Sequence, residues 1–188
     1  MIRTIVPLFA MALVASVPAL ASEVVPVPHF DAVGLRGGGS VVLVPGASQR
    51  VTILEGSSQF THIYVQRGGS LEIDACDRNC PQHYRLRVEV QSPRVPTMAV
   101  DGGGEISVAG GFPSERELTL AVNGGGKIDT RAVNANDVTA SVNGGGDLFV
   151  RAAARLTGAV RGGGSVRYLG NPDVTSAVEG GGSIRPGY

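Results

Sequence analysis

The sequence predicts an all-β fold, a single-domain parallel β-solenoid (β-helix) built on repeated Gly-Gly-Gly bends. Three observations support this prediction: one glycine-centred template recurs along the chain, its copies are nearly evenly spaced, and no segment after residue 21 carries a good helical stripe. The 28 glycines among 188 residues come in blocks, unlike the every-third pattern of collagen or the diffuse pattern of a flexible linker.

Residues 1–21 have the features of a secretory signal peptide. Arg3 gives a short positive start, an apolar run follows, and Ala19-Leu20-Ala21 is a small-x-small cleavage site. The run is shorter than the roughly 20 apolar residues of a membrane span, and no later stretch reaches even its length. We therefore expect an exported protein with no transmembrane span in the mature chain. An uncleaved N-terminal membrane anchor is the alternative.

The rest of the chain divides by the spacing of the template. Residues 22–29 form a leader rich in Pro and Val, and residues 30–188 form the predicted domain. Up to about residue 95 the copies stand 30 and 35 residues apart, so wider coils are expected there. From about residue 98 the spacings are 22, 20, 18 and 18 residues, a period typical of stacked repeats. The apolar pattern continues across this junction, which favours one domain.

Each copy reads apolar-x-Gly-Gly-Gly-polar-apolar, and a further copy, from Val65 to Leu71, has Arg67 in place of its first glycine. The apolar positions share one parity with two of the glycines, which indicates a strand that enters and leaves a bend. Glycine suits a bend because it accepts a positive φ and lets another backbone approach closely. The glycines assigned to the bends are Gly37, Gly39, Gly102, Gly104, Gly124, Gly126, Gly144, Gly146, Gly162, Gly164, Gly180 and Gly182.

Cys76 and Cys80 stand four residues apart in a chain that we expect to be exported. In an oxidising compartment such a pair most often closes a disulfide loop, and one turn of chain brings the two α-carbons within the required distance of about 4.4–6.8 Å. The alternatives are a redox-active pair and a metal site with His83 as third ligand. Neither fits well, because the redox motif is Cys-x-x-Cys and the loop lacks a fourth ligand. We predict a structural disulfide, no metal site and no cofactor.

Stacking the copies in register would place their polar positions in two columns. The column before the glycines contains Asp101, Asn123, Asn143, Arg161 and Glu179. The column after the glycines contains Glu105, Lys127, Asp147, Ser165 and Ser183. Opposite charges and amide pairs in such columns favour one strand register, which is the simpler interpretation. The functional interpretation is that a shallow polar strip beside bare glycine backbone binds an extended ligand such as a glycan.

The segment from Ser92 to Ile106, followed by repeated Ser/Ala-Val-x-Gly-Gly-Gly-x-Ile/Leu/Val units, resembles the GIN domain family, described as putative auto-transporter adhesin heads. The resemblance covers about Phe30 to the C-terminus. It implies an exported bacterial β-solenoid whose biochemical role is essentially unassigned, and it transfers no catalytic residues. The usual family unit has Gly-small-Gly, whereas the middle residue is Gly in all six complete copies of this chain.

Composition and motifs disfavour several function classes. Acidic and basic side chains balance at 16 each, so no net charge attracts a nucleic acid. No nucleophile elbow, zinc-protease motif or phosphate loop is present. Glu105, Lys127 and Asp147 are the only mixed trio that the register would bring together, and their alternating charge already explains them as ion pairs. We therefore predict no catalytic residues.

The resulting prediction is an exported, non-catalytic protein that presents a binding or adhesive surface in the periplasm or at the cell surface. A small envelope enzyme acting on polysaccharide and a purely structural envelope protein are the alternatives. The expected partner is a glycan or another envelope protein. If Pro186 does not block the last strand edge, end-to-end dimers are also expected.

Overall fold

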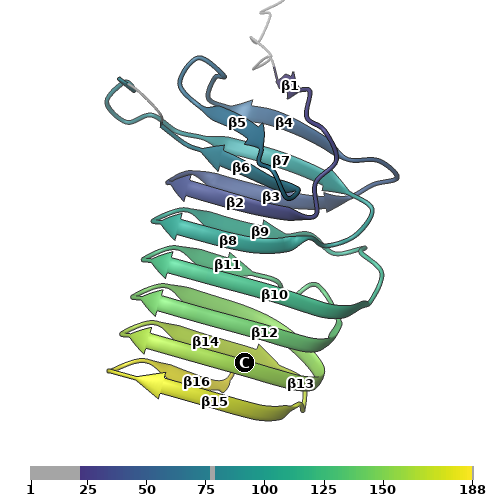
Figure 1. Cartoon of the computed structure of the whole chain (residues 1–188), viewed down its shortest axis with the longest axis vertical. Helices are drawn as coiled ribbons and strands as arrows, with labels where there is room; N and C mark the ends of the chain where they lie inside the picture. Colours follow the sequence, from purple (N-terminus) through teal and green to yellow (C-terminus); the bar gives the residue numbers. More distant parts are fainter. Residues whose placement is uncertain (1–21, 77–78, 188) are drawn as a thin grey trace, which may run out of the picture.

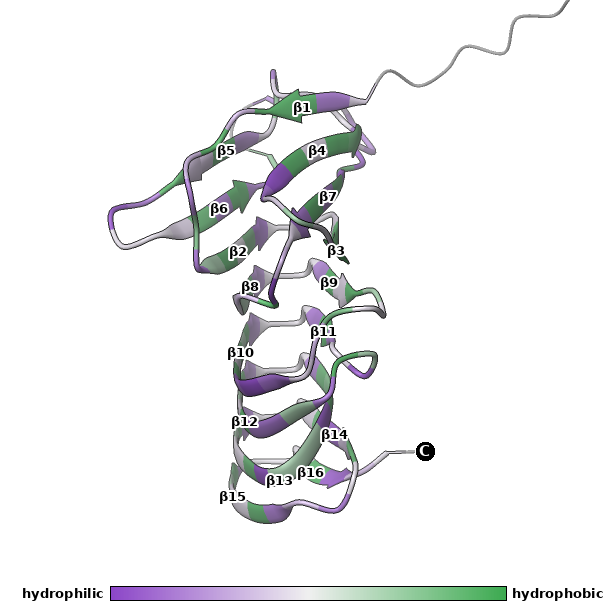
Figure 2. Ribbon diagram, turned by 90° about the vertical axis from the view of Figure 1, so that its right-hand side faces the viewer, coloured by the Kyte–Doolittle hydropathy of each residue, from purple (hydrophilic) through white to green (hydrophobic). Residues whose placement is uncertain are grey.

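The computed structural model describes residues 22–76 and 79–187, so the predicted signal peptide, residues 1–21, lies outside the described residues. The described strands form one connected all-β sheet (Figure 1). The sheet folds back on itself at β13 (Asp147–Gly162), whose first part lies on one face and whose second part lies on the other. Figure 2 shows these two faces, sheet A and sheet B, along the length of the molecule.

Alternating apolar and polar residues form most of these strands, because the inward side chains are buried and their neighbours are not. Sheet A contains β1 (Glu23–Val25), β4 (Arg50–Glu55), β7 (Arg87–Ser92), β3 (Ser40–Pro45), β9 (Glu105–Val108), β11 (Lys127–Asp129), the start of β13, β14 (Ser165–Leu169) and β16 (Ser183–Pro186). Sheet B contains β5 (His62–Val65), β6 (Ser70–Asp74), β2 (Ala32–Gly37), β8 (Thr97–Gly102), β10 (Glu115–Gly124), β12 (Ala135–Gly144), the rest of β13, and β15 (Asp173–Glu179). Their apolar side chains meet in one core.

Strand orientation corrects the predicted fold. β1 pairs antiparallel with β4, β4 with β7, and β5 with β6. The other pairs of described strands are parallel. The prediction of a parallel β-solenoid (β-helix) is therefore wrong: the all-β fold is a sheet of mixed orientation that wraps its core as a flattened, nearly closed barrel.

The copy of the template that contains Arg67 accounts for one of the antiparallel pairs. Residues 66–69 form a tight turn in which the Gln66 N–H donates to the Ser70 carbonyl at 2.8 Å. Gly68 and Gly69 take φ angles of 111° and 82° there. So short a turn joins antiparallel strands, since parallel neighbours need a long crossover. This copy therefore forms the hairpin β5–β6 and not a bend between the two sheets.

The six complete copies each join a strand of sheet B to a strand of sheet A through a triple-glycine bend, and we call each such pair of strands a level. Neighbouring levels pair residue by residue from β2 to β15. The inward valines Val122, Val142 and Val160 are at most 1 % exposed. On the last level β15 pairs only with β13, and its Val174 and Val178 are 40 % and 43 % exposed.

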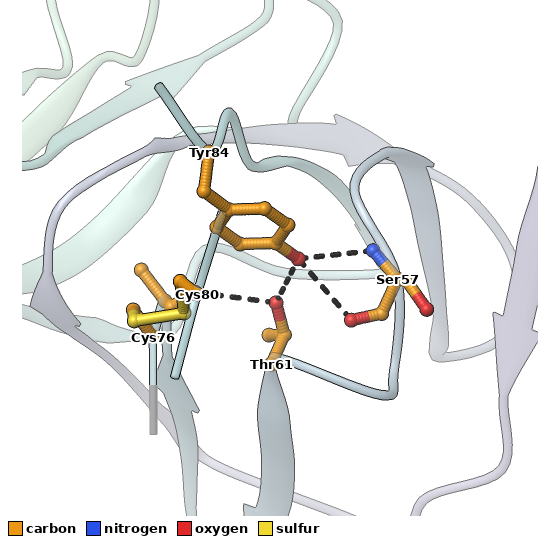
Figure 3. Close-up of a disulfide and its surroundings, with 6 residues drawn as sticks. Ser57, Thr61, Cys76, Cys80 and Tyr84 are labelled. Carbon is orange, nitrogen blue, oxygen red and sulfur yellow. Dashed lines mark hydrogen bonds between the residues drawn. A yellow bond between two sulfur atoms is a disulfide. The ribbon is translucent and has the colours of Figure 1, made fainter. Parts of the chain in front are cut away.

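The predicted disulfide between Cys76 and Cys80 is confirmed, with the two α-carbons 6.0 Å apart. It lies beside a small hydrogen-bonded group centred on Tyr84 (Figure 3). The Tyr84 hydroxyl accepts from the Ser57 N–H at 2.9 Å and lies 2.7 Å from the Thr61 hydroxyl. These contacts hold Tyr84, four residues beyond Cys80, against the turn at Ser57.

Replacing both cysteines, Cys76→Ala together with Cys80→Ala, is expected to lower the free energy of unfolding by no more than about 2 kcal/mol. The reason is that closing so short a loop removes little chain entropy from the unfolded state. Urea denaturation of the variant measures this, and the wild-type protein in reductant is the control. A loss well above this value, in both samples, would show that the loop supports the core.

Candidate binding surface

The six triple-glycine bends lie one above the next along one side of the molecule, at the left of Figure 1. We call this side the bend edge. It follows from the sequence pattern, because each glycine block falls where a strand of sheet B must turn into sheet A. The predicted columns flank it, one on each sheet.

The column on sheet B pairs in the predicted register, in the order Asp101, Asn123, Asn143, Arg161 and Glu179. The Asn123 side chain donates to Asp101 Oδ1 at 2.8 Å. Arg161 Nε lies 3.2 Å from Glu179 Oε2. Arg36 of β2 extends the column, with its Nε 3.7 Å from Asp101 Oδ2. These contacts run between neighbouring strands.

The column on sheet A also pairs in register, in the order Glu105, Lys127, Asp147, Ser165 and Ser183. Lys127 Nζ donates to Glu105 Oε1 at 2.8 Å. Ser165 donates to Asp147 Oδ1 at 2.5 Å. Each such pair contributes about 0.2–1 kcal/mol to one register. The predicted trio of Glu105, Lys127 and Asp147 is brought together, as a row of alternating charge on an open face.

The three glycines of a bend differ in what the fold requires of them. The first takes a positive φ, for example 127° at Gly144 and 109° at Gly162. A Cβ on the third would clash, since at Gly146 it would lie 2.5 Å from both the Gly126 carbonyl oxygen and Val122 Cγ1. A Cβ on the middle glycine would meet nothing within 4 Å, and its φ lies outside the left-handed region; these are Gly38, Gly103, Gly125, Gly145, Gly163 and Gly181.

The middle glycines also leave polar backbone groups at the surface. The N–H groups of Gly125 and Gly145 donate to the first glycine of the preceding level, at 2.9 Å each. The carbonyls of the six middle glycines accept no backbone hydrogen bond from a described residue. The bend edge therefore has a row of carbonyl oxygens without a backbone donor among the described residues, between two rows of polar side chains.

A second cluster lies on the outer face of sheet A, two residues beyond the column, around Phe149. Lys127, Arg131 and Arg167 place their cationic groups 5.5, 5.0 and 5.6 Å from the ring centroid. Arg131 forms a bidentate pair with Asp129. Burial opposes ionisation of Asp129, but the hydrogen bonds and charge of Arg131, together with the charge of Lys127, hold the pKa of this carboxyl below its usual value.

The enzyme alternative needs carboxylates at a fixed separation, and one hollow gathers two. A cavity of about 570 Å³ on sheet A is lined by Glu55, Glu105, Arg85 and Arg87, among others. Sequence reasoning did not place Glu55 there, because it belongs to the antiparallel strand β4.

Among the described residues, no three His, Cys, Asp or Glu side chains are grouped to hold a metal ion. No helix in the described part of the chain is long and apolar enough to cross a membrane.

Comparison with known proteins finds a match to one family model over part of the chain and matches to solved structures. A putative adhesin from Bacteroides fragilis matches with a TM-score of 0.54 and 18 % identity over 88 % of this chain and 96 % of that chain. A putative adhesin from Parabacteroides merdae has a TM-score of 0.42 and 16 % identity, covering 91 % and 97 %. A putative lipid binding protein from Parabacteroides distasonis has a TM-score of 0.39 and 13 % identity, covering 89 % and 96 %.

No curated protein matches the chain in sequence. At 18 % identity, the likeness to the Bacteroides fragilis protein shows a shared fold. Part of the chain also matches a family model, which agrees with the resemblance in its glycine units. Residues 114–172 match the family described as putative auto-transporter adhesin, head GIN domain, and the Bacteroides fragilis protein is described as a putative adhesin.

Proposed function

We propose that this protein is an exported, non-catalytic binding protein that presents an adhesive surface at the cell envelope, with the bend edge and its two columns as that surface. The observation that carries the proposal is the middle glycine of each bend. Six times the chain keeps a residue without a side chain where the fold has open space and an ordinary φ. Neither packing nor backbone conformation requires glycine at these positions.

These glycines have an energetic cost. Where the backbone conformation suits other residues, glycine in place of alanine costs about 0.4–1 kcal/mol, because the unfolded chain is more flexible. The fold gains nothing in return, so we attribute the bare backbone to contact with a ligand. A ligand can approach the backbone closely only where no side chain stands in the way.

The polar groups along the bend edge indicate the kind of ligand. Carbonyl oxygens accept hydrogen bonds, and each level adds one polar or charged side chain from each column, so that carboxylates, amides, hydroxyls and cations alternate along the edge. A hydroxyl-rich, extended molecule can use this repeated pattern along its length. A glycan chain of the envelope is therefore the ligand class that we propose, in keeping with the adhesin description of the matching family.

The test places side chains on the bend edge without disturbing the fold. Wild-type protein and the variant Gly125→Gln with Gly145→Gln are compared on a glycan array and by titration with each glycan bound. We expect the variant to remain folded and to bind at least tenfold more weakly. The matched control, Thr139→Gln with Thr157→Gln, places the same side chains at exposed, in-register positions of sheet B away from the bend edge. Equal affinity of the bend variant and wild type would contradict the proposal.

The polysaccharide enzyme is the second candidate, favoured by the hollow that contains Glu55 and Glu105. Reducing-end release from envelope polysaccharides is measured for wild type and for Glu105→Ala, Lys127→Ala and Asp147→Ala. We expect no turnover in any sample. Turnover that is present in wild type and lost in a folded variant would replace the binding proposal by catalysis. An empty glycan array together with empty pull-downs from envelope extract would favour a structural role.

A further inference from the structure

Two arginines stand side by side on the last two strands of sheet A. Arg167 on β14 is in register with Arg185 on β16, and parallel neighbours lie only about 4.8 Å apart. Both side chains are exposed, and neither makes an ion pair with a described residue. Like charges directly opposite each other destabilise a sheet. This pair therefore opposes the fold that contains it.

Elsewhere on paired strands, two charged residues in register usually carry opposite charges. Lys127 is in register with Glu105, and Arg161 with Glu179. Among the paired strands of the described chain, only one other register pair has like charges, Glu117 with Asp137, and there Arg155 on the next strand binds Asp137 at 2.8 Å. No acidic residue is in register with Arg167 to offset this repulsion, because its neighbours are Phe149 and Arg185.

An aromatic ring lies against Arg167, and a cavity adjoins both arginines. Arg167 lies over the Phe149 ring, 5.6 Å from its centroid, and a cation over an aromatic face is attracted to it. A cavity of about 420 Å³ is lined by Arg167, Arg185, Pro186 and Gly187. Each guanidinium group is planar and permanently charged, and it can donate two parallel hydrogen bonds to a pair of oxygens. Two such groups beside a cavity therefore suit carboxylate, sulfate or phosphate groups.

We propose that Arg167 and Arg185 form an anion site that binds the acidic groups of a glycan, so that the ligand is an acidic polysaccharide. This proposal rests on the proposed function and specifies its ligand. The site lies two residues beyond Ser165 and Ser183, so one glycan chain can contact the bend edge and reach it. The bound anion would neutralise the repulsion, which explains why the chain keeps two adjacent arginines there.

The features of this face favour an acidic polysaccharide over an anionic membrane. The exposed large apolar side chains of the described chain are Val24, Val174 and Val178, on β1 and β15, so none lies beside the arginines to enter a lipid layer. Asp129 and Asp147 share the face and would repel a flat anionic surface. A flexible chain can place its acidic groups at the arginines and its neutral groups beside the carboxylates.

The experiment titrates the protein with decagalacturonate and with its fully methyl-esterified, neutral form. We expect wild type to prefer the acidic form, and Arg167→Gln or Arg185→Gln to weaken its binding at least tenfold. The matched control is Arg155→Gln, which removes the same charge from an exposed position on sheet B. It should leave the affinity within twofold of wild type.

The variant Arg185→Glu separates loss of the site from loss of the fold. It puts an acidic group in register with Arg167, so we expect a melting temperature equal to or above that of wild type, together with loss of decagalacturonate binding. A lower melting temperature would contradict the proposed repulsion.

Three outcomes would overturn the anion site. Glycan binding that shows no preference for decagalacturonate over its neutral form, and that Arg185→Glu leaves unchanged, would overturn this site while the proposed function stands. Absence of binding to any glycan would overturn both. Binding to phosphatidylglycerol vesicles but not to decagalacturonate, lost in Arg185→Glu, would assign the arginines to a membrane surface.

Discussion

Replacing Gly144 by alanine is expected to lower the free energy of unfolding by about 3 kcal/mol. Gly144 has a φ of 127°, and a Cβ there would lie 2.5 Å from the Gly124 carbonyl oxygen. Strain at such a φ costs about 1–3 kcal/mol, and forcing the next level away adds an overpacking cost of similar size. Because the bend is paired with both neighbouring levels, the displacement cannot stay local. Urea denaturation measures the change.

The adjacent glycine provides the control. Gly145→Ala adds the same methyl group one residue further along, where a Cβ meets nothing within 4 Å. We expect this variant to be more stable than wild type by about 0.4–1 kcal/mol, because alanine restricts the unfolded chain. Equal stability losses in the two variants would show that the bends do not distinguish their first and middle residues.

Replacing Glu115 by alanine is expected to lower the free energy of unfolding by about 2–3 kcal/mol. Glu115 is 4 % exposed, and its carboxylate accepts from the Val95 N–H at 3.1 Å and from Arg94 Nε at 3.2 Å. Alanine would leave the buried Val95 N–H without a partner, and an unsatisfied buried donor costs about 1–3 kcal/mol in addition to the lost charged contact. Thermal and urea denaturation check this value.

Two further variants separate the contributions at Glu115. Glu115→Gln retains an oxygen for the Val95 N–H and loses the charge, so its stability should lie between those of wild type and the alanine variant. Arg94→Met removes the cation and leaves the carboxylate buried, which should also destabilise the fold. A glutamine variant as unstable as the alanine variant would show that charge, not the backbone contact, matters at this position.

The level-by-level register of the second half could be predicted from the sequence. The template repeats there with its valines, glycines and polar positions in fixed order, and each strand has a similar strand on both sides. The disulfide followed from the spacing of Cys76 and Cys80 in a chain expected to be exported. These features depend on local pattern and on contacts between similar neighbours, which one sequence contains.

The antiparallel strands of the first half could not be derived in the same way. The pairing of β4 with β7 joins segments that share no template, so nothing in the sequence specifies it. Arg67 was the available signal at the hairpin, because a side chain replaced the first glycine of a bend. Glu115 and Arg94 lie 21 residues apart, and only the folded chain shows that they meet.

Two parts of the candidate surface were present in the sequence but were not recognised. The parity of the pattern separates the first and third glycine of each bend from the middle one, but only the space around each Cβ position shows that the middle position could carry a side chain. The arginine pair follows from extending the column at Ser165 and Ser183 by two residues along both copies. In both features, the middle glycines and the arginine pair, the residue present does not stabilise the fold.

The two ends of the sheet differ in how readily their edge strands can pair with a strand of another molecule. At one end the outermost strands, β1 and β5, are three and four residues long, which is a common protection against pairing with other chains. At the other end β15 offers seven residues with unpaired backbone groups and two uncovered valines. Among the described strands, β15 is the only long strand with an unpaired edge. Self-association through β15 would pair this edge in both molecules. Growth would therefore stop at a symmetric pair and would not continue into a fibre.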